Sequence, residues 1–68
     1  MIKVKELTEV QKNKLFGLEK CDGFWLGSKG FKHKRTIYTV DIVGAIWTHT
    51  NNRGAKYADW QNIRNLFK

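Results

Sequence analysis

Along positions 36–50 one parity is mainly apolar and the other is mixed, as expected of a β-strand whose two faces differ. The segment is rich in β-branched and aromatic residues, which favour a pleated sheet. Because it is longer than a typical strand, we expect a bend or bulge near Gly44. The even-numbered set is apolar and is predicted to face the helices: Tyr38, Val40, Ile42 and Ile46. If the bulge leaves the alternation unchanged, Trp47 lies on the opposite, open face.

Two short helices are predicted from their capping residues. Thr8 and Gln11 match a capping box, and Gly17 is a suitable stop, so we expect a helix over about 9–16. Asp59 is a good N-cap for a second helix near the C-terminus. The apolar residues of that second helix fall on one predicted face: Trp60, Ile63, Leu66 and Phe67.

The remaining pattern predicts further strands. Residues 1–7 alternate apolar and charged side chains and are predicted to form a first strand, and 24–26 a second one followed by a turn at 27–30. The segment 51–54 has the residues of a tight hairpin turn, so 55–58 is expected to return antiparallel to the end of 36–50. The predicted fold class is α+β in the order β-α-β-β-β-α, with three to four antiparallel strands packed against one or two short helices.

Length and composition limit this fold to one small domain, 1–68, with a single core. Trp25 and Trp60 are assigned to that core. The lone cysteine, Cys21, fits a reducing compartment, and no segment is apolar enough for a signal peptide or membrane anchor, so we expect a cytoplasmic protein with no membrane partner. A monomer and a homodimer paired through a strand edge both fit.

The positive charge is concentrated in the middle of the chain. The chain has 13 Lys and Arg against six acids, and 23–58 holds six of these cations against one acid, Asp41. Such a field attracts polyanions, nucleic acid above all. The expected phosphate contacts are Lys29, Lys32, Lys34, Arg35, Arg53 and Lys56. The alternative for the basic run 29–35 is a solvated hairpin that only aids solubility.

Two aromatic residues are candidates for stacking on a base. Phe31 lies within the basic run, which is expected to be a glycine-flanked loop, and Trp47 is expected on the open face. For both residues the competing interpretation is packing within the protein, because so small a core needs its large side chains.

Catalytic chemistry has little support in the sequence. His33 and His49 have no carboxylate at a spacing that would orient them. Two histidines and one cysteine do not make a zinc site, and no phosphate-binding glycine loop opens a helix. We therefore expect neither an enzyme nor a metal site nor a cofactor.

Together these features predict a small, non-catalytic nucleic-acid-binding protein that contacts backbone phosphates, with DNA or RNA and single or double strands left open. The alternative is a small protein-interaction module or inhibitor. Such a module would dock on an acidic surface of a larger nucleic-acid-processing enzyme, because an acidic protein groove attracts the same side chains.

Overall fold

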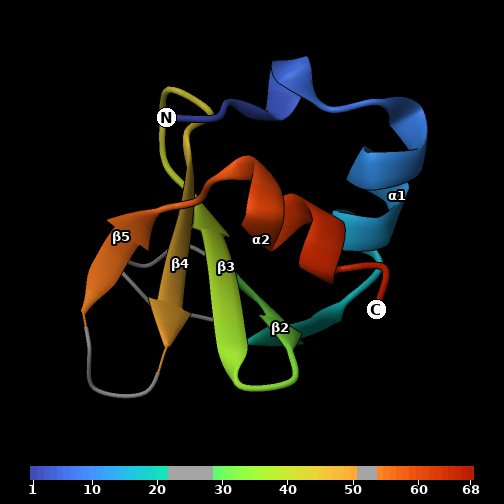
Figure 1. Ribbon diagram of the computed structural model, residues 1–68. Coiled ribbons are helices and arrows are strands. Elements are labelled where there is room, and N and C mark those ends of the chain that lie inside the picture. The colour runs from blue at the N-terminus through green and yellow to red at the C-terminus, as the bar shows by residue number, and fades with distance from the viewer. Residues whose placement is uncertain (22–28, 51–53) are drawn as a thin grey trace.

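The computed structural model describes residues 1–21, 29–50 and 54–68. In chain order the elements are the 3₁₀ helix η1 (Val4–Glu6), helix α1 (Glu9–Phe16), strands β1 (Glu19–Cys21), β2 (Gly30–His33), β3 (Thr36–Val40), β4 (Ile46–Thr50) and β5 (Ala55–Tyr57), and helix α2 (Trp60–Asn65). The strands form one antiparallel sheet in the order β1-β2-β3-β4-β5 (Figure 1). The fold is α+β as predicted, with five strands where three to four were expected.

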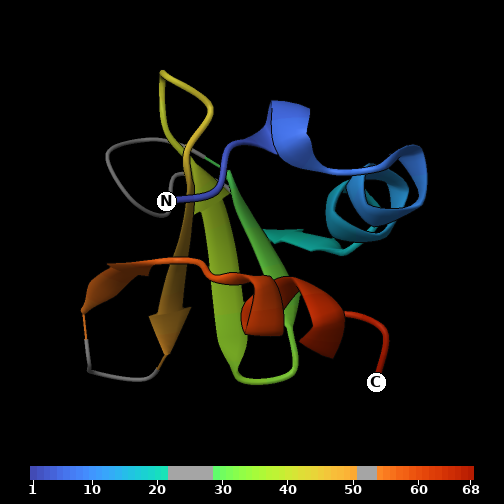
Figure 2. The same ribbon diagram turned by 45° about the horizontal axis from the view of Figure 1, so that its top comes forward.

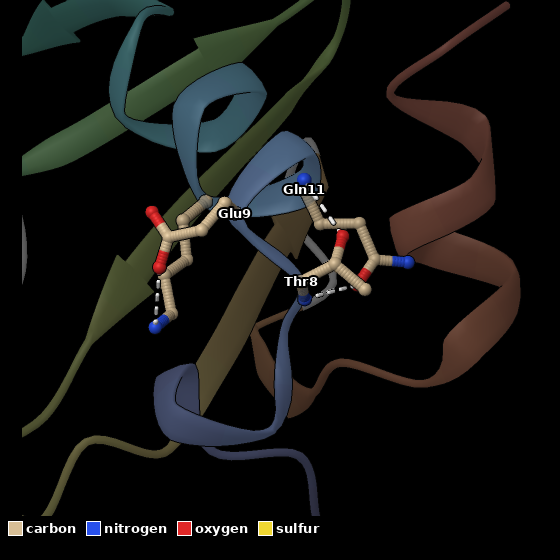
Figure 3. Close-up of polar contacts among 4 residues, drawn as sticks. Thr8, Glu9 and Gln11 are labelled. Carbon is tan, nitrogen blue, oxygen red and sulfur yellow. Dashed lines mark hydrogen bonds and ion pairs between the residues drawn. The ribbon is translucent and has the colours of Figure 1, made fainter.

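Helix α1 has the bounds that its capping residues predict. The backbone N–H of Gln11 donates to Thr8 Oγ1 at 3.2 Å, and the N–H of Thr8 donates to Gln11 Oε1 at 2.9 Å (Figure 3). This reciprocal pair satisfies two amides that have no partner within the helix. Gly17 follows the last turn, where its N–H donates to the carbonyl of Asn13.

Helix α2 begins at the predicted cap. Asp59 Oδ1 accepts from the N–H of Asn62 at 2.9 Å, and Asn62 Oδ1 accepts from the N–H of Asp59 at 2.8 Å. The helix crosses one face of the sheet, as both views show (Figures 1 and 2). The acidic cap and its amide partner therefore fix where the chain leaves β5 and turns back over the sheet.

The apolar face of α2 is narrower than its sequence spacing indicates. Ile63 and Leu66 are fully buried, but Trp60 is 42% exposed and Phe67 is half-exposed. The assignment of Trp60 to the core is therefore wrong. With only six residues, the helix makes its core contact through its middle, and the aromatic residues at its two ends extend beyond that contact.

Residues 36–50 make a complete reversal instead of a bend or bulge. β3 and β4 pair as a hairpin whose five-residue loop, 41–45, contains Gly44 at a φ of +86°. The pairing of Val40 with Ile46 keeps even-numbered residues opposite even-numbered ones, so the predicted alternation survives. Ile42, which was expected to face the helices, lies in the loop and is 104% exposed.

The N-terminal segment is not a strand. Among the residues that the structure describes, it pairs with the sheet at the bridge between Lys3 and Ala45 and then forms η1. The alternation of residues 1–7 does predict burial, because Ile2 and Leu7 both lie in the core. Local bonding ends the extended backbone here, since the N–H of Glu6 donates back to the carbonyl of Lys3.

The basic run 29–35 is mostly strand, which corrects its assignment as a loop. β2 extends over Gly30–His33, and its pairing partners are β3 and the unpredicted strand β1. Phe31 is 8% exposed and packs edge-to-face on Phe16 of α1, with ring centroids 5.2 Å apart. Its placement at a loop tip is therefore wrong, and its ring has no free face to offer a base.

The strand predicted at 24–26, Trp25 and most of the turn at 27–30 lie outside the described residues, as do positions 51–53 of the second hairpin turn. The return strand β5 pairs antiparallel with β4 as expected, and Gly54 adopts a φ of +76° just before it. No helix in the described part of the chain is long and apolar enough to cross a membrane.

Both helices lie on the same face of the sheet (Figure 2). The core fills the space between them and the sheet, with partly buried Val4, Leu18 and Val40 around it. Its members are Ile2, Leu7, Leu15, Phe31, Tyr38, Ile46, Ala58, Ile63 and Leu66.

Candidate functional site

Two polar hollows border α2 at the end of the sheet that carries the β2–β3 turn, and we refer to them together as the groove. They have volumes of about 500 and 300 Å³ and share Asn62. The first is lined by Arg35, Thr48, Thr50, Gly54, Lys56, Tyr57, Asp59 and Asn62, and the second by His33, Lys34, Thr36, Tyr38, Asn62, Asn65 and Lys68. Hydroxyl, amide and cationic groups therefore dominate the lining, as expected of a site for a polar anionic ligand.

Cations from three separate parts of the chain converge on this groove. Lys34 and Arg35 form the β2–β3 turn, Lys56 lies on β5, and Lys68 follows α2. Lys34 adopts a φ of +56°, the left-handed conformation that a two-residue hairpin turn requires. All four side chains are exposed.

The groove carries little negative charge to offset these cations. Asp59 is the carboxylate among its lining residues, and one of its oxygens already accepts from the N–H of Asn62. Within residues 1–21, 29–50 and 54–68, the ion pair formed is Lys12–Glu9 on α1, outside the groove. Burial, together with the charges of Lys34 and Lys14, lowers the pKa of His33 at the groove wall. The groove is therefore electropositive.

The floor of the groove is held by partly buried hydrogen bonds. Tyr38 is 2% exposed, and its hydroxyl donates to the backbone carbonyl of Asn62 at 3.0 Å, which connects β3 to α2. Thr48 Oγ1 donates to the carbonyl of Lys56 at 3.3 Å, which connects β4 to β5. Because these bonds join the floor to both walls, the groove is shaped before any ligand arrives.

The structure brings together only part of the predicted phosphate-binding set. Lys34, Arg35 and Lys56 share the groove, whereas Lys32 points to the opposite face of the sheet, where its neighbours are residues of β1 and β3. Lys29 precedes β2 and is separated from Lys34 by the length of that strand, about 16 Å. Arg53 lies outside the described residues.

Lys68 lines the groove although the sequence pattern did not indicate it. A single cation after the last helix resembles any other solvated lysine, and only the packing of α2 across the sheet brings it close to the β2–β3 turn. Tyr57, which the sequence left unassigned, also borders the groove from the edge strand β5.

Trp47 lies on the face of the sheet away from the helices, as the alternation predicts, but its indole is already engaged. Its Nε1–H donates to Asp41 Oδ2 at 2.9 Å, and its ring lies 4.0 Å from that of Tyr57, centroid to centroid. This face is not open throughout, because neighbouring Thr39 is fully buried. Trp47 is half-buried and already contacts Asp41 and Tyr57. Less of its ring is therefore available for a ligand to contact.

The two histidines lie apart on opposite faces of the sheet. His33 borders the groove, while His49 Nε2 is 2.9 Å from Thr39 Oγ1 on the other face, where burial lowers the pKa of His49. Over the part of the chain that the structure describes, no three His, Cys, Asp or Glu side chains are grouped closely enough to hold a metal ion.

Comparison of the chain with protein-family models, with curated protein sequences and with solved structures finds no significant match. The functional assignment therefore depends on the residues and geometry of the groove.

Proposed function

We propose that this protein binds nucleic acid without catalysis, and that the groove along α2 contacts the phosphate backbone. The observation that supports this proposal is the convergence of Lys34, Arg35, Lys56 and Lys68, from three distant segments, on one hollow surface. Charges that only aid solubility are not expected to gather in a groove whose lining side chains include a single carboxylate, itself engaged in a helix cap. A phosphate backbone, in contrast, requires several cations in a row.

The size of the site predicts how binding depends on salt. Each neutralised phosphate contributes about −0.7 for a single strand, or about −0.9 for a duplex, to the slope of log K against log salt. Four groove cations therefore predict a slope between about −2.8 and −3.6. A site that depended on hydrogen bonds or apolar contact alone would show almost no slope.

Fluorescence anisotropy with a labelled oligonucleotide of about 20 nucleotides tests the proposal, because that length spans the site of one small domain. The informative variant is Arg35→Gln with Lys56→Gln, which removes two groove charges. At about 0.1 M salt the loss of two phosphate contacts weakens binding roughly 25- to 60-fold and makes the slope shallower by about 1.4 to 1.8.

The matched control is Lys5→Gln with Lys32→Gln. It removes the same net charge from exposed positions outside the groove, on η1 and on the opposite face of the sheet. We expect a much smaller loss of affinity and a nearly unchanged slope. Equal weakening by the two double variants, or a flat salt response of the wild type, would refute the groove as the binding site.

An acidic protein surface is the second candidate ligand, and one observation favours it. The β3–β4 loop is closely bonded, since Asp41 Oδ1 accepts from the N–H groups of Val43 and Ala45, yet it presents the fully exposed Ile42 to solvent. The adjacent Val43 is 61% exposed, and neighbouring exposed apolar residues of this kind are found at protein contacts. Recovery of one stoichiometric partner from nuclease-treated lysate by the wild type, and its loss with Ile42→Ser, would select this candidate over nucleic acid.

A further inference from the structure

Tyr57 borders the groove and carries a half-exposed aromatic ring on the opposite face of the sheet, beside Trp47. It lies on β5, an edge strand of the sheet, and its side chain is 50% exposed. The ring of Trp47 packs against it at 4.0 Å between centroids with 30° between the ring planes. The tyrosine is thus supported by Trp47, and half of its surface remains exposed to solvent.

The support beneath Tyr57 is rigid. Trp47 Nε1 donates to Asp41 Oδ2, and the other oxygen of that carboxylate accepts from the N–H groups of Val43 and Ala45 at 3.0 and 2.9 Å. The indole is therefore held by a loop whose own backbone is fixed by the same carboxylate. Because Tyr57 packs on this fixed indole, Tyr57 loses little conformational freedom when a base stacks on it.

The position of Tyr57 along β5 connects it to the cations. It directly follows Lys56, and because side chains alternate along a strand the two point to opposite sides of the same edge. Tyr57 also borders the hollow that contains Arg35 and Lys56. A nucleotide whose phosphate lies in the groove can therefore pass its base around the edge strand onto the ring.

The other exposed aromatic residues in the described part of the chain lack this combination. Trp60 and Phe67 are exposed to a similar extent at the ends of α2, but neither lines the hollows of the groove. Phe16 is 37% exposed and packs on Phe31, but it also lies outside the groove lining. Of these four residues, Tyr57 is the one that both borders the groove and has a second ring behind it.

We infer that Tyr57 is a base-stacking residue and that the ligand of the groove is single-stranded nucleic acid. The bases of a duplex are paired and stacked inside the helix, so they have no free face for a ring at a sheet edge, whereas every unpaired base has one. This inference rests on the proposed function, since it takes the phosphate groove as given and adds the base contact.

Anisotropy titrations with three labelled probes of equal length test it: an oligothymidylate, an abasic oligonucleotide and a blunt-ended duplex. Stacking of one base raises the affinity for oligothymidylate over the abasic strand by about 5- to 160-fold. Tyr57→Phe keeps this preference because it keeps the ring. Tyr57→Leu loses it while leaving the salt slope unchanged, because no charge is removed. Trp60→Leu, the matched control at an exposed aromatic residue outside the groove lining, keeps both.

The possible results separate the two proposals. Equal affinity of the wild type for oligothymidylate and the abasic strand, or a preference for the duplex, overturns the stacking inference and leaves the groove in place. A preference that survives in a folded Tyr57→Leu protein overturns the role of Tyr57. Failure of all three probes to bind with a measurable salt slope overturns the proposed function itself. The wild-type comparison alone decides the ligand class even if Tyr57→Leu does not fold.

Discussion

Replacement of Tyr38 by phenylalanine isolates one hydrogen bond between the sheet and α2. The hydroxyl of this almost fully buried residue donates to the carbonyl of Asn62 at 3.0 Å. That carbonyl belongs to the last turn of a helix, where backbone carbonyls lack donors within the helix. Tyr38→Phe keeps the ring and its packing but leaves the partly buried carbonyl without its donor.

The expected cost follows from this geometry. Leaving a buried acceptor unsatisfied lowers the free energy of unfolding by about 1–2 kcal/mol. In a domain of this size each kcal/mol lowers Tm by about 4–8 °C, so we expect a decrease between about 4 and 16 °C. Thermal unfolding followed by circular dichroism measures it. Tyr57→Phe is the matched control, because it removes a hydroxyl from a half-exposed tyrosine and should change Tm by less than about 2 °C.

The same bond predicts a change in alkaline stability. Burial, and to a lesser extent the charge of Asp59, raises the pKa of Tyr38 above its ordinary value of 10.0. The folded state therefore keeps its proton when the unfolded state has lost it, and stability falls as the pH rises above about 10. Tyr38→Phe should flatten that decline. A Tm for Tyr38→Phe equal to that of Tyr57→Phe at neutral pH would refute the structural role of the bond.

Three further changes test other parts of the fold. Leu15→Ala removes a fully buried side chain from α1 and should cost about 2–5 kcal/mol in urea unfolding, whereas Val10→Ala on the exposed side of the same helix should cost far less. Asp59→Ala removes the N-cap of α2 and should cost about 1 kcal/mol; an unchanged urea midpoint would contradict the cap. The hydrogen bond from the Trp47 indole, followed by those from backbone N–H groups, lowers the pKa of Asp41 below 3.8. The ionised carboxylate therefore stabilises the folded state above that pH, and this stabilisation is lost in more acidic solution. Asp41→Asn should therefore lower Tm at pH 7 more than at pH 3, and equal losses at the two pH values would contradict this.

The helices were predictable because their signals are local. The capping boxes at Thr8 and Asp59 need only residues three positions apart, so the sequence contains all the groups that form them. The return strand β5 was predictable for a similar reason, since a turn-forming segment lies between it and β4.

The candidate site was predictable only in part. The concentration of charge indicated an anionic partner and named Lys34, Arg35 and Lys56, which do share the groove. It also named Lys32, which the alternation along β2 directs to the other face, and it gave no reason to include Lys68. Net charge along a chain carries no information about which face of a sheet a side chain occupies.

By itself, the sequence determined the α+β class, the ends of α1, the start of α2 and the excess of positive charge, since each depends on composition or on contacts within a few residues. The tertiary structure alone decided that Phe31 is buried on α1, that the N-terminal segment forms a short 3₁₀ helix at Val4–Glu6 instead of a strand, and that cations from three segments meet below α2 beside Tyr57. Those outcomes depend on strand register and on the packing of a helix across the sheet, which join residues far apart in the chain and are selected by burial of the shared core.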